Sequence, residues 1–201
     1  PFGTVAIELC EDLWSPDGPM RRRAYAGAEL VLNLSASPFR LGVVRTRREM
    51  ISTRAGDNNA TVAYVNLVGA NDGLVFDGGG YVAQNGRLVH EAPRFSEGLT
   101  AVTVDLDRTR RLRTENTTWR EDQAAFVASA VRVARVASDK VVGQPQKLTY
   151  PVPAHGSFFL PAETIRLTPR ASFCEDLLDA LSLGIGDYFE KTGAFKQIGV
   201  A

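Results

Sequence analysis

The sequence has few of the residues that mark metal sites and disulfide frameworks. Its 201 residues include two cysteines, two histidines and two methionines. Two cysteines in unlike contexts give no disulfide framework, which fits a reducing cytoplasm. His90 and His155 lie in contexts that predict neither a metal cluster nor a catalytic partner, so we expect no metal ion in this chain. No apolar run approaches the roughly twenty residues that a bilayer span requires.

The chain also lacks an excess of either charge. Lys and Arg number 23, Asp and Glu number 23, and the formal net charge is zero. The basic residues are dispersed or form short runs such as Arg21–Arg23 and Arg110–Arg111, without the basic face of a nucleic-acid groove. We therefore expect neither a nucleic acid nor a membrane as partner. The hydrophobic fraction of 44% is that of an ordinary globular chain with one sizeable core and an appendage.

Cys10 is the residue most suggestive of chemistry. It ends the apolar run Thr4–Leu9 and is followed by Glu11, Asp12 and then turn formers from Pro16 onward. This pattern predicts a buried strand that opens into a loop at its carboxyl end, where α/β sheets place their sites. A free cysteine is often only a small core residue. Here the two carboxylates that follow favour a polar cleft or the surface.

Cys174 provides an internal comparison, because the same Glu-Asp-Leu tripeptide follows it. Around it, apolar residues from Phe173 to Phe189 recur at three- and four-residue spacing, which predicts an amphipathic helix. We therefore expect Cys174 to pack beside the buried stripe of that helix. The strand end and the following turn, rather than the tripeptide, distinguish Cys10.

The first half of the chain alternates strand and helix signals, as in an α/β sandwich. We expect helices and strands in the order helix Pro19–Ala28, strand Glu29–Leu34, helix Val44–Asn58 and strand Thr61–Val68. A β-hairpin should then turn at Asn85-Gly86, which suits a tight type I′ turn. A further strand is expected over Leu99–Leu106, with Asp105 or Asp107 beginning a short basic helix.

The second half has weaker signals. A helix is expected within Glu121–Val136, and Ser138–Arg170 holds five prolines, which predicts a linker or wrapping arm. A helix over Ser172–Thr192 and an apolar strand beginning at Gln197 follow. Because the chain opens almost directly in a strand and stops within one, we expect it to be cut from a larger protein.

Two glycine clusters look like nucleotide-binding motifs. Gly184 and Gly186 lack a third glycine and lie inside a helical pattern, so they do not make a dinucleotide fingerprint. Gly78–Gly80 precedes a hairpin instead of a helix N-terminus, so we expect a tight turn there.

Three segments carry a resemblance to a known family: Cys10–Pro16, Leu32–Phe39 and Asp77–Gly79. They resemble the glutaminase domain of bacterial glutamine-dependent NAD synthetases, in the nitrilase superfamily. The resemblance continues through Phe173–Gly193 and the closing Gln197–Ala201, which look like the approach to the ATP-dependent synthetase domain.

The resemblance implies an α/β fold, namely the C-terminal half of a nitrilase-type α/β/β/α sandwich followed by a linker and the start of an α/β synthetase domain. Residues 1–113 would be the nucleophile-bearing half of the glutaminase domain, 114–170 a helix and Pro-rich arm, and 171–201 the first helix and strand of the synthetase domain. The implied partners are glutamine, the missing N-terminal half, the synthetase domain and a second copy in a homo-oligomer. This chain would hold no cofactor, whereas ATP and magnesium would serve the synthetase domain.

The resemblance also implies roles for individual residues. Cys10 would be the nucleophile of a Glu-Lys-Cys triad, and Glu11 and Ser37 would hold the amino-acid end of glutamine. From the residues alone, Glu11 could equally be a turn-capping acid and Ser37 a loop hydroxyl that bonds its own backbone. The family often has a basic residue where this chain has Val43. Arg40 or Arg45 would then make the contact to the α-carboxylate of glutamine in its place.

The glutamate and lysine of the triad precede the nucleophile by many residues in the family, whereas nine residues precede Cys10 here. We therefore expect the isolated chain to be inactive. Two other interpretations stay open: a stand-alone nitrilase-type amidase, and a non-catalytic module that serves as an assembly surface.

Overall fold

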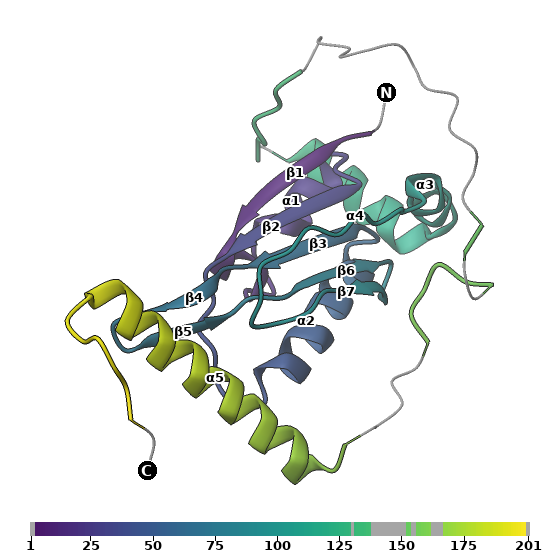
Figure 1. Cartoon of the computed structure of the whole chain (residues 1–201). Helices are drawn as coiled ribbons and strands as arrows, with labels where there is room; N and C mark the ends of the chain where they lie inside the picture. The colour runs from purple at the N-terminus through teal and green to yellow at the C-terminus, as the bar shows by residue number, and fades with distance from the viewer. Residues whose placement is uncertain (1–2, 130, 138–151, 154–155, 162–166, 200–201) are drawn as a thin grey trace, which may run out of the picture.

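The structure is a computed structural model that describes residues 3–129, 131–137, 152–153, 156–161 and 167–199. A five-stranded sheet forms its centre, in the order β1-β2-β3-β6-β7 (Figure 1). The first three strands are parallel and the last two are antiparallel to their neighbours. The strands are β1 Val5–Leu9, β2 Leu30–Ser35, β3 Thr61–Asn66, β6 Gly80–Gln84 and β7 Arg87–Glu91. Chain order and parallel pairing confirm the predicted α/β fold.

Two helices cover one face of this sheet. They are α1, Pro19–Tyr25, and α2, Val43–Asp57. The core between helices and sheet is built from alternate strand residues and from the inner faces of the helices, because successive strand side chains point to opposite faces. Its main members are Leu13, Met20, Val31, Ile51, Ala55, Val62, Tyr64, Tyr81 and Ala83.

The opposite face of the sheet is apolar and largely open. Ile7 is 58% exposed, Leu34 is 50% exposed and Val65 is 55% exposed. A hollow of about 950 Å³ lies on this face, lined by the central strands and by Leu99, Val102 and Val104. These last three belong to the segment that crosses the sheet between β7 and the next helix (Figure 1).

The prediction of a strand over Leu99–Leu106 is wrong. Residues 99–105 form no strand, and a helix begins at Leu106. Leu99 is fully exposed, whereas Val102 and Val104 are half-buried. The alternating pattern thus reflects a segment that lays one side on the sheet without pairing with a strand.

The predicted hairpin at Asn85-Gly86 is confirmed. It joins β6 to β7, and Asn85 and Gly86 have φ values of 48° and 92°, as a type I′ turn requires. The sequence did not predict a second hairpin, β4 Val68–Asn71 with β5 Leu74–Asp77. Its existence ends the third strand at Asn66 instead of Val68. Gly78 and Gly79 link β5 to β6 with φ values of 67° and 82°, but the tight turn predicted there is absent, because Gly78 forms a β-bridge with Arg94.

Two consecutive helices follow the sheet: α3, Leu106–Glu115, and α4, Thr117–Ala128. Asp105 begins α3, as predicted, because its Oδ1 accepts a hydrogen bond from the N–H of Arg108 at 3.1 Å. Asn116 begins α4 in the same way, through the N–H of Trp119. The helix predicted over Glu121–Val136 is therefore shifted toward the N-terminus and ends at Ala128. Most of the Pro-rich segment lies outside the described residues, and so does His155.

The last helix, α5, spans Pro169–Thr192 and lies along the β4-β5 hairpin (Figure 1). Asp187 accepts a hydrogen bond from the N–H of Ala70 at 2.6 Å, and Lys191 donates to the carbonyl of Ala70 at 2.5 Å. Gly184 faces Val75, where an added Cβ would lie 3.1 Å from a methyl carbon. The helical position of this glycine agrees with the prediction.

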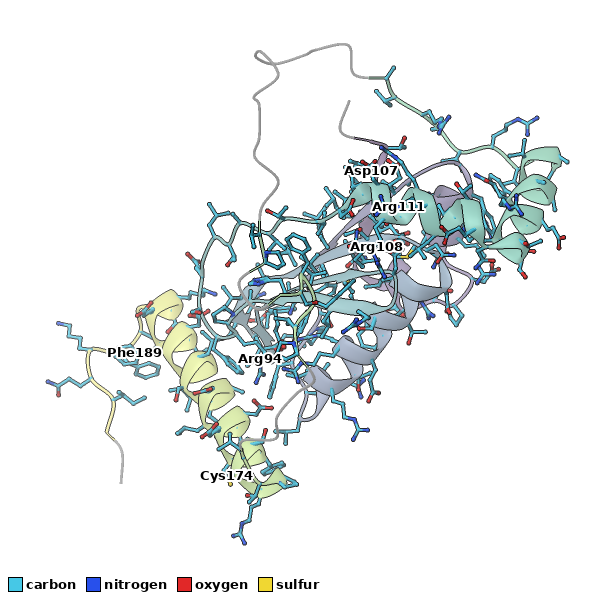
Figure 2. All side chains as sticks on the ribbon, turned by 90° about the vertical axis from the view of Figure 1, so that its right-hand side faces the viewer. Arg94, Asp107, Arg108, Arg111, Cys174 and Phe189 are labelled. Atoms are coloured by element: carbon cyan, nitrogen blue, oxygen red, sulfur yellow. The ribbon has the colours of Figure 1, made fainter. Side chains whose placement is uncertain are left out.

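Cys174 is exposed, so the prediction that it packs against a buried stripe is wrong (Figure 2). The apolar residues around it are exposed as well: Phe173 by 48%, Leu178 by 65% and Ile185 by 51%. The helical pattern is real, but most of its apolar surface lies away from the hairpin. The strand expected from Gln197 is absent from residues 197–199, and its end lies outside the described residues. No described helix is long and apolar enough to cross a membrane.

Candidate active site

Cys10 lies at the point where β1 ends and a 3-10 turn, η1, begins. The turn spans Cys10–Leu13, and Cys10 is half-buried. Its φ of 43° is uncommon for a residue other than glycine and resembles the strained positions found at functional turns. Asp12 stabilises the turn, because its Oδ2 accepts a hydrogen bond from the N–H of Leu9 at 3.1 Å. The amide of Asn33 donates to the carbonyl of Cys10 at 3.4 Å.

Glu11 sits beside Cys10 in the same turn, and its side chain is exposed. The sequence left open that Glu11 is a turn-capping acid. In the structure Asp12 takes that role, and Glu11, one position after Cys10, is exposed. A carboxylate in this place is available to bind a cation such as an α-ammonium group.

Ser37 lies at the same edge of the sheet as Cys10. Strands β1 and β2 are parallel with Leu9 beside Leu34, so the residues that follow each strand emerge together. Ser37 is 7% exposed. Its N–H donates to Oδ1 of Asn66 at 2.8 Å, and its carbonyl accepts from Nδ2 of Asn66 at 3.1 Å. The Asn66 side chain thus bonds both backbone polar groups of Ser37.

A buried ion pair that the sequence analysis missed supports this loop. Arg47 and Asp77 have no exposed side-chain surface, and Nη1 of Arg47 lies 2.7 and 2.8 Å from the two carboxylate oxygens of Asp77. Nη2 of Arg47 donates to the carbonyl of Ser37 at 3.0 Å and to its hydroxyl at 3.3 Å. Nothing in the sequence sets Arg47 apart from the neighbouring arginines of α2, so only its packing distinguishes it.

The two basic residues suggested from the sequence are both exposed, Arg40 in the loop that carries Ser37 and Arg45 in the first turn of α2. Arg45 pairs with Glu49 one turn along α2 at 2.8 Å, and its side chain is 87% exposed. Arg40 is exposed and Val43 is buried at the first position of α2. Arg47 is the basic side chain whose hydrogen bonds reach Ser37 among the described residues.

A row of buried polar residues crosses the helix-covered face just below this edge. Glu8 is paired in register with Asn33, and Asn33 with Tyr64. Burial raises the pKa of Glu8 to about 7, although Arg23, 3.2 Å away, opposes the rise. Burial also raises the pKa of Tyr64, although the positive charge of Arg47 opposes the rise. The sequence signal for this row was the presence of polar residues within strands that are otherwise apolar.

The described residues do not complete a Glu-Lys-Cys triad. Of the lysines in the described part of the chain, Lys191 and Lys196 lie within and after α5, and Lys191 bonds Ala70 on the hairpin. Among the described residues, no group of three or more His, Cys, Asp or Glu side chains is placed to hold a metal ion. The site as described therefore offers a thiol, a carboxylate and a rigid loop.

Comparison with known proteins agrees with this architecture. Residues 1–114 match the carbon-nitrogen hydrolase family. A glutamine-dependent NAD(+) synthetase of Aquifex aeolicus is 36% identical over 195 residues, which cover 96% of this chain and 31% of that protein. One from Xanthomonas campestris is 42% identical over 88 residues, covering 44% of this chain and 16% of that protein. The resemblance inferred from the motifs is confirmed.

Among solved structures, the carbon-nitrogen hydrolase of Helicobacter pylori G27 superposes with a TM-score of 0.52 at 24% identity. The superposition covers 60% of this chain and 46% of that one, and it supports the fold. The chain spans about a third or less of the synthetases it matches. On the match over residues 1–114, the chain belongs to the carbon-nitrogen hydrolase family.

Proposed function

We propose that this chain is the nucleophile-bearing part of a glutamine amidohydrolase within a glutamine-dependent NAD synthetase. The observation that carries the proposal is the placement of Cys10 in a strained turn at the carboxyl edge of the parallel strands, beside the Ser37 loop. Two further facts support it: the family match over residues 1–114, and similarity to the Aquifex synthetase over nearly the whole chain.

In the proposed reaction, the Cys10 thiolate attacks the side-chain amide carbon of glutamine. The tetrahedral intermediate expels ammonia and leaves a glutamyl thioester, which water hydrolyses to glutamate and the free thiol. A lysine from the missing part of the triad and backbone N–H groups in η1 would stabilise the oxyanion. The glutamate of the triad would take the thiol proton and give it to the leaving ammonia.

Glu11 and Ser37 are proposed to hold the amino-acid end of glutamine. The exposed carboxylate of Glu11 suits the α-ammonium group, and the hydroxyl of Ser37 can serve either charged group. Both emerge at the same edge of the sheet as Cys10. Because these contacts are remote from the reacting amide, they should set KM more than the chemical step.

We propose the division 1–113 for the glutaminase part, 114–170 for the connecting helix and arm, and 171–201 for the start of the synthetase domain. The family match ending at residue 114 and the separate helix α5 support it. ATP and magnesium would act in the synthetase domain, on nicotinic acid adenine dinucleotide and the ammonia released at Cys10.

Replacing Cys10 by Ala in the full-length enzyme tests the assignment. We expect glutamine-supported NAD synthesis to be lost, because the nucleophile is gone, whereas ammonia-supported synthesis should stay near the wild-type rate. Cys174→Ala is the matched control, because Cys174 is exposed on α5 and should leave both activities unchanged. Steady-state rates with either nitrogen source decide the matter. A Cys10→Ala enzyme that used glutamine normally would contradict the assignment, and a wild-type enzyme that never used glutamine would favour an assembly module.

A further inference from the structure

The loop after β2 depends on side chains for its shape. At Ser37 both the N–H and the C=O bond to Asn66 at 2.8 and 3.1 Å, as one strand would bond to another. Asn66 is the last residue of β3, the strand next to β2. The side chain therefore continues the sheet ladder for one residue beyond the ends of the strands, and it fixes the orientation of the Ser37 peptide.

Arg47 adds a second restraint from the helix side. Its guanidinium bonds Asp77 through Nη1, and Nη2 donates to the carbonyls of Ser37 at 3.0 Å and Pro38 at 3.5 Å. An ion pair with no exposed surface gains little net stability, because desolvation of both charges offsets their attraction. A planar fork held at one end by a carboxylate does, however, present its other N–H groups in a fixed direction.

Asp77 bonds further residues besides Arg47. It also accepts a hydrogen bond from Asn66 at 3.4 Å and pairs with Arg94 at 3.5 Å. Figure 2 shows Arg94 between the sheet and α5, where it also pairs with Asp176. The cluster of Arg47, Asp77 and Asn66 thus joins α2, β3 and the end of β5 directly beneath one loop.

We propose that Arg47, Asp77 and Asn66 are positioning residues that set the affinity and selectivity of the site for the amino-acid end of glutamine. The proposal rests on the proposed function, in which Ser37 contacts that end. The bonds of the cluster to the loop all reach Ser37 or Pro38. The Cys10 turn takes its hydrogen bonds from Asn33 and Asp12, and Arg47, Asp77 and Asn66 make no hydrogen bond to Cys10 among the described residues. Loosening the cluster should therefore weaken substrate binding and spare the nucleophile.

The chain offers a matched control on the same helix. Arg48 bonds Glu91 of β7 through Nε at 3.0 and 2.9 Å, and the two side chains are 27% and 21% exposed. This pair has the same chemistry as Arg47–Asp77 and also links α2 to the sheet, but it reaches β7 instead of the Ser37 loop. Arg48→Lys thus reports the general cost of replacing a bonded arginine in α2.

The test compares two electrophiles on the full-length enzyme. A glutamine-mimicking diazo ketone needs both the amino-acid contacts and the thiol, whereas iodoacetamide needs the thiol alone. In Arg47→Lys the charge remains but the fork is lost, so we expect the rate of labelling by the diazo ketone to fall about tenfold or more. Labelling by iodoacetamide should change less than about twofold, and KM for glutamine should rise about as much as it does in Ser37→Ala.

Asn66→Ala keeps the ion pair and should likewise slow labelling by the diazo ketone while sparing labelling by iodoacetamide. This variant decides the test if Arg47→Lys does not fold. Arg48→Lys should leave both labelling rates and KM near wild type. The proposal is overturned if both electrophiles slow equally, if neither slows, or if Arg48→Lys matches Arg47→Lys. If the diazo ketone labels Cys10 of the wild-type enzyme but Ser37→Ala leaves KM for glutamine unchanged, the positioning role is overturned and the proposed function stands. A wild type that resists the diazo ketone would overturn the proposed function itself.

Discussion

The two faces of the central sheet are built from alternate residues of the same strands, yet they have opposite surroundings. On β3, Val62 is fully buried under the helices and Val65 is 55% exposed on the other face. On β1, Glu8 is 1% exposed and its neighbour Ile7 is 58% exposed. The buried charge and the exposed aliphatic residue are thus adjacent in the chain.

The polar residues near Cys10 lie on the helix-covered face, whereas the open face carries aliphatic residues suited only to packing. The helix-covered face carries the polar row of Glu8, Asn33 and Tyr64 and leads to the turn of Cys10. The open face is aliphatic along β1, β2 and β3, which is the composition of a surface made to be covered. We infer that the open face packs against the part of the sandwich that this chain does not supply.

The largest expected effect concerns the chain expressed as residues 1–201 alone. We expect it to aggregate and to lack glutaminase activity, because the open face and the free edge of β1 recruit other chains and the triad is incomplete. Size-exclusion chromatography with hydrogen exchange measures this. Lysine at both Ile7 and Val65 should make the chain more soluble. A monodisperse wild-type chain that hydrolysed glutamine would refute the incomplete-triad argument as well.

A smaller effect should come from Glu8, the buried charge of the covered face. Its pKa is raised from an ordinary 4.5 to about 7, so the folded state holds the proton more tightly than the unfolded state. Its contribution to stability is then full below pH 4.5 and is lost as the pH rises through 7, by about 3 kcal/mol. Thermal unfolding of the full-length enzyme from pH 4.5 to 8 should show this loss in wild type and not in Glu8→Gln. Glu49→Gln, at an exposed pair, is the control and should follow wild type.

The smallest expected effect compares two valines of β3. Val62→Ala in the full-length enzyme should cost about 2 kcal/mol of unfolding free energy, because it empties a packed site. If the open face is covered in that enzyme, Val65→Ala should cost nearly as much despite its exposure here. Denaturant unfolding followed by a probe in this domain compares the two variants. A cost below about 0.5 kcal/mol at Val65 would mean that the face stays open.

Local patterns were enough for much of the fold. The parallel strands, the helices α1, α2 and α5, and the turn at Asn85-Gly86 were predicted because periodicity and turn residues act over a few positions. The same signals failed where burial is decided by distant elements. The segment Leu99–Leu106 alternates because it lies on a sheet face, and Cys174 is exposed because most of the apolar surface of α5 has no described partner.

The sequence by itself determined which residue could be the nucleophile and where the chain turns, since Cys10 stands where an apolar strand meets carboxylates and turn formers. The tertiary structure decided which arginine supports the site. Arg45, Arg47 and Arg48 are close together in the sequence of α2, but only the helix orientation directs Arg47 inward to Asp77. A buried charge must find its partner across the fold, and that partner is 30 residues away along the chain. A sequence pattern that extends over a few residues cannot reveal a partner so far along the chain.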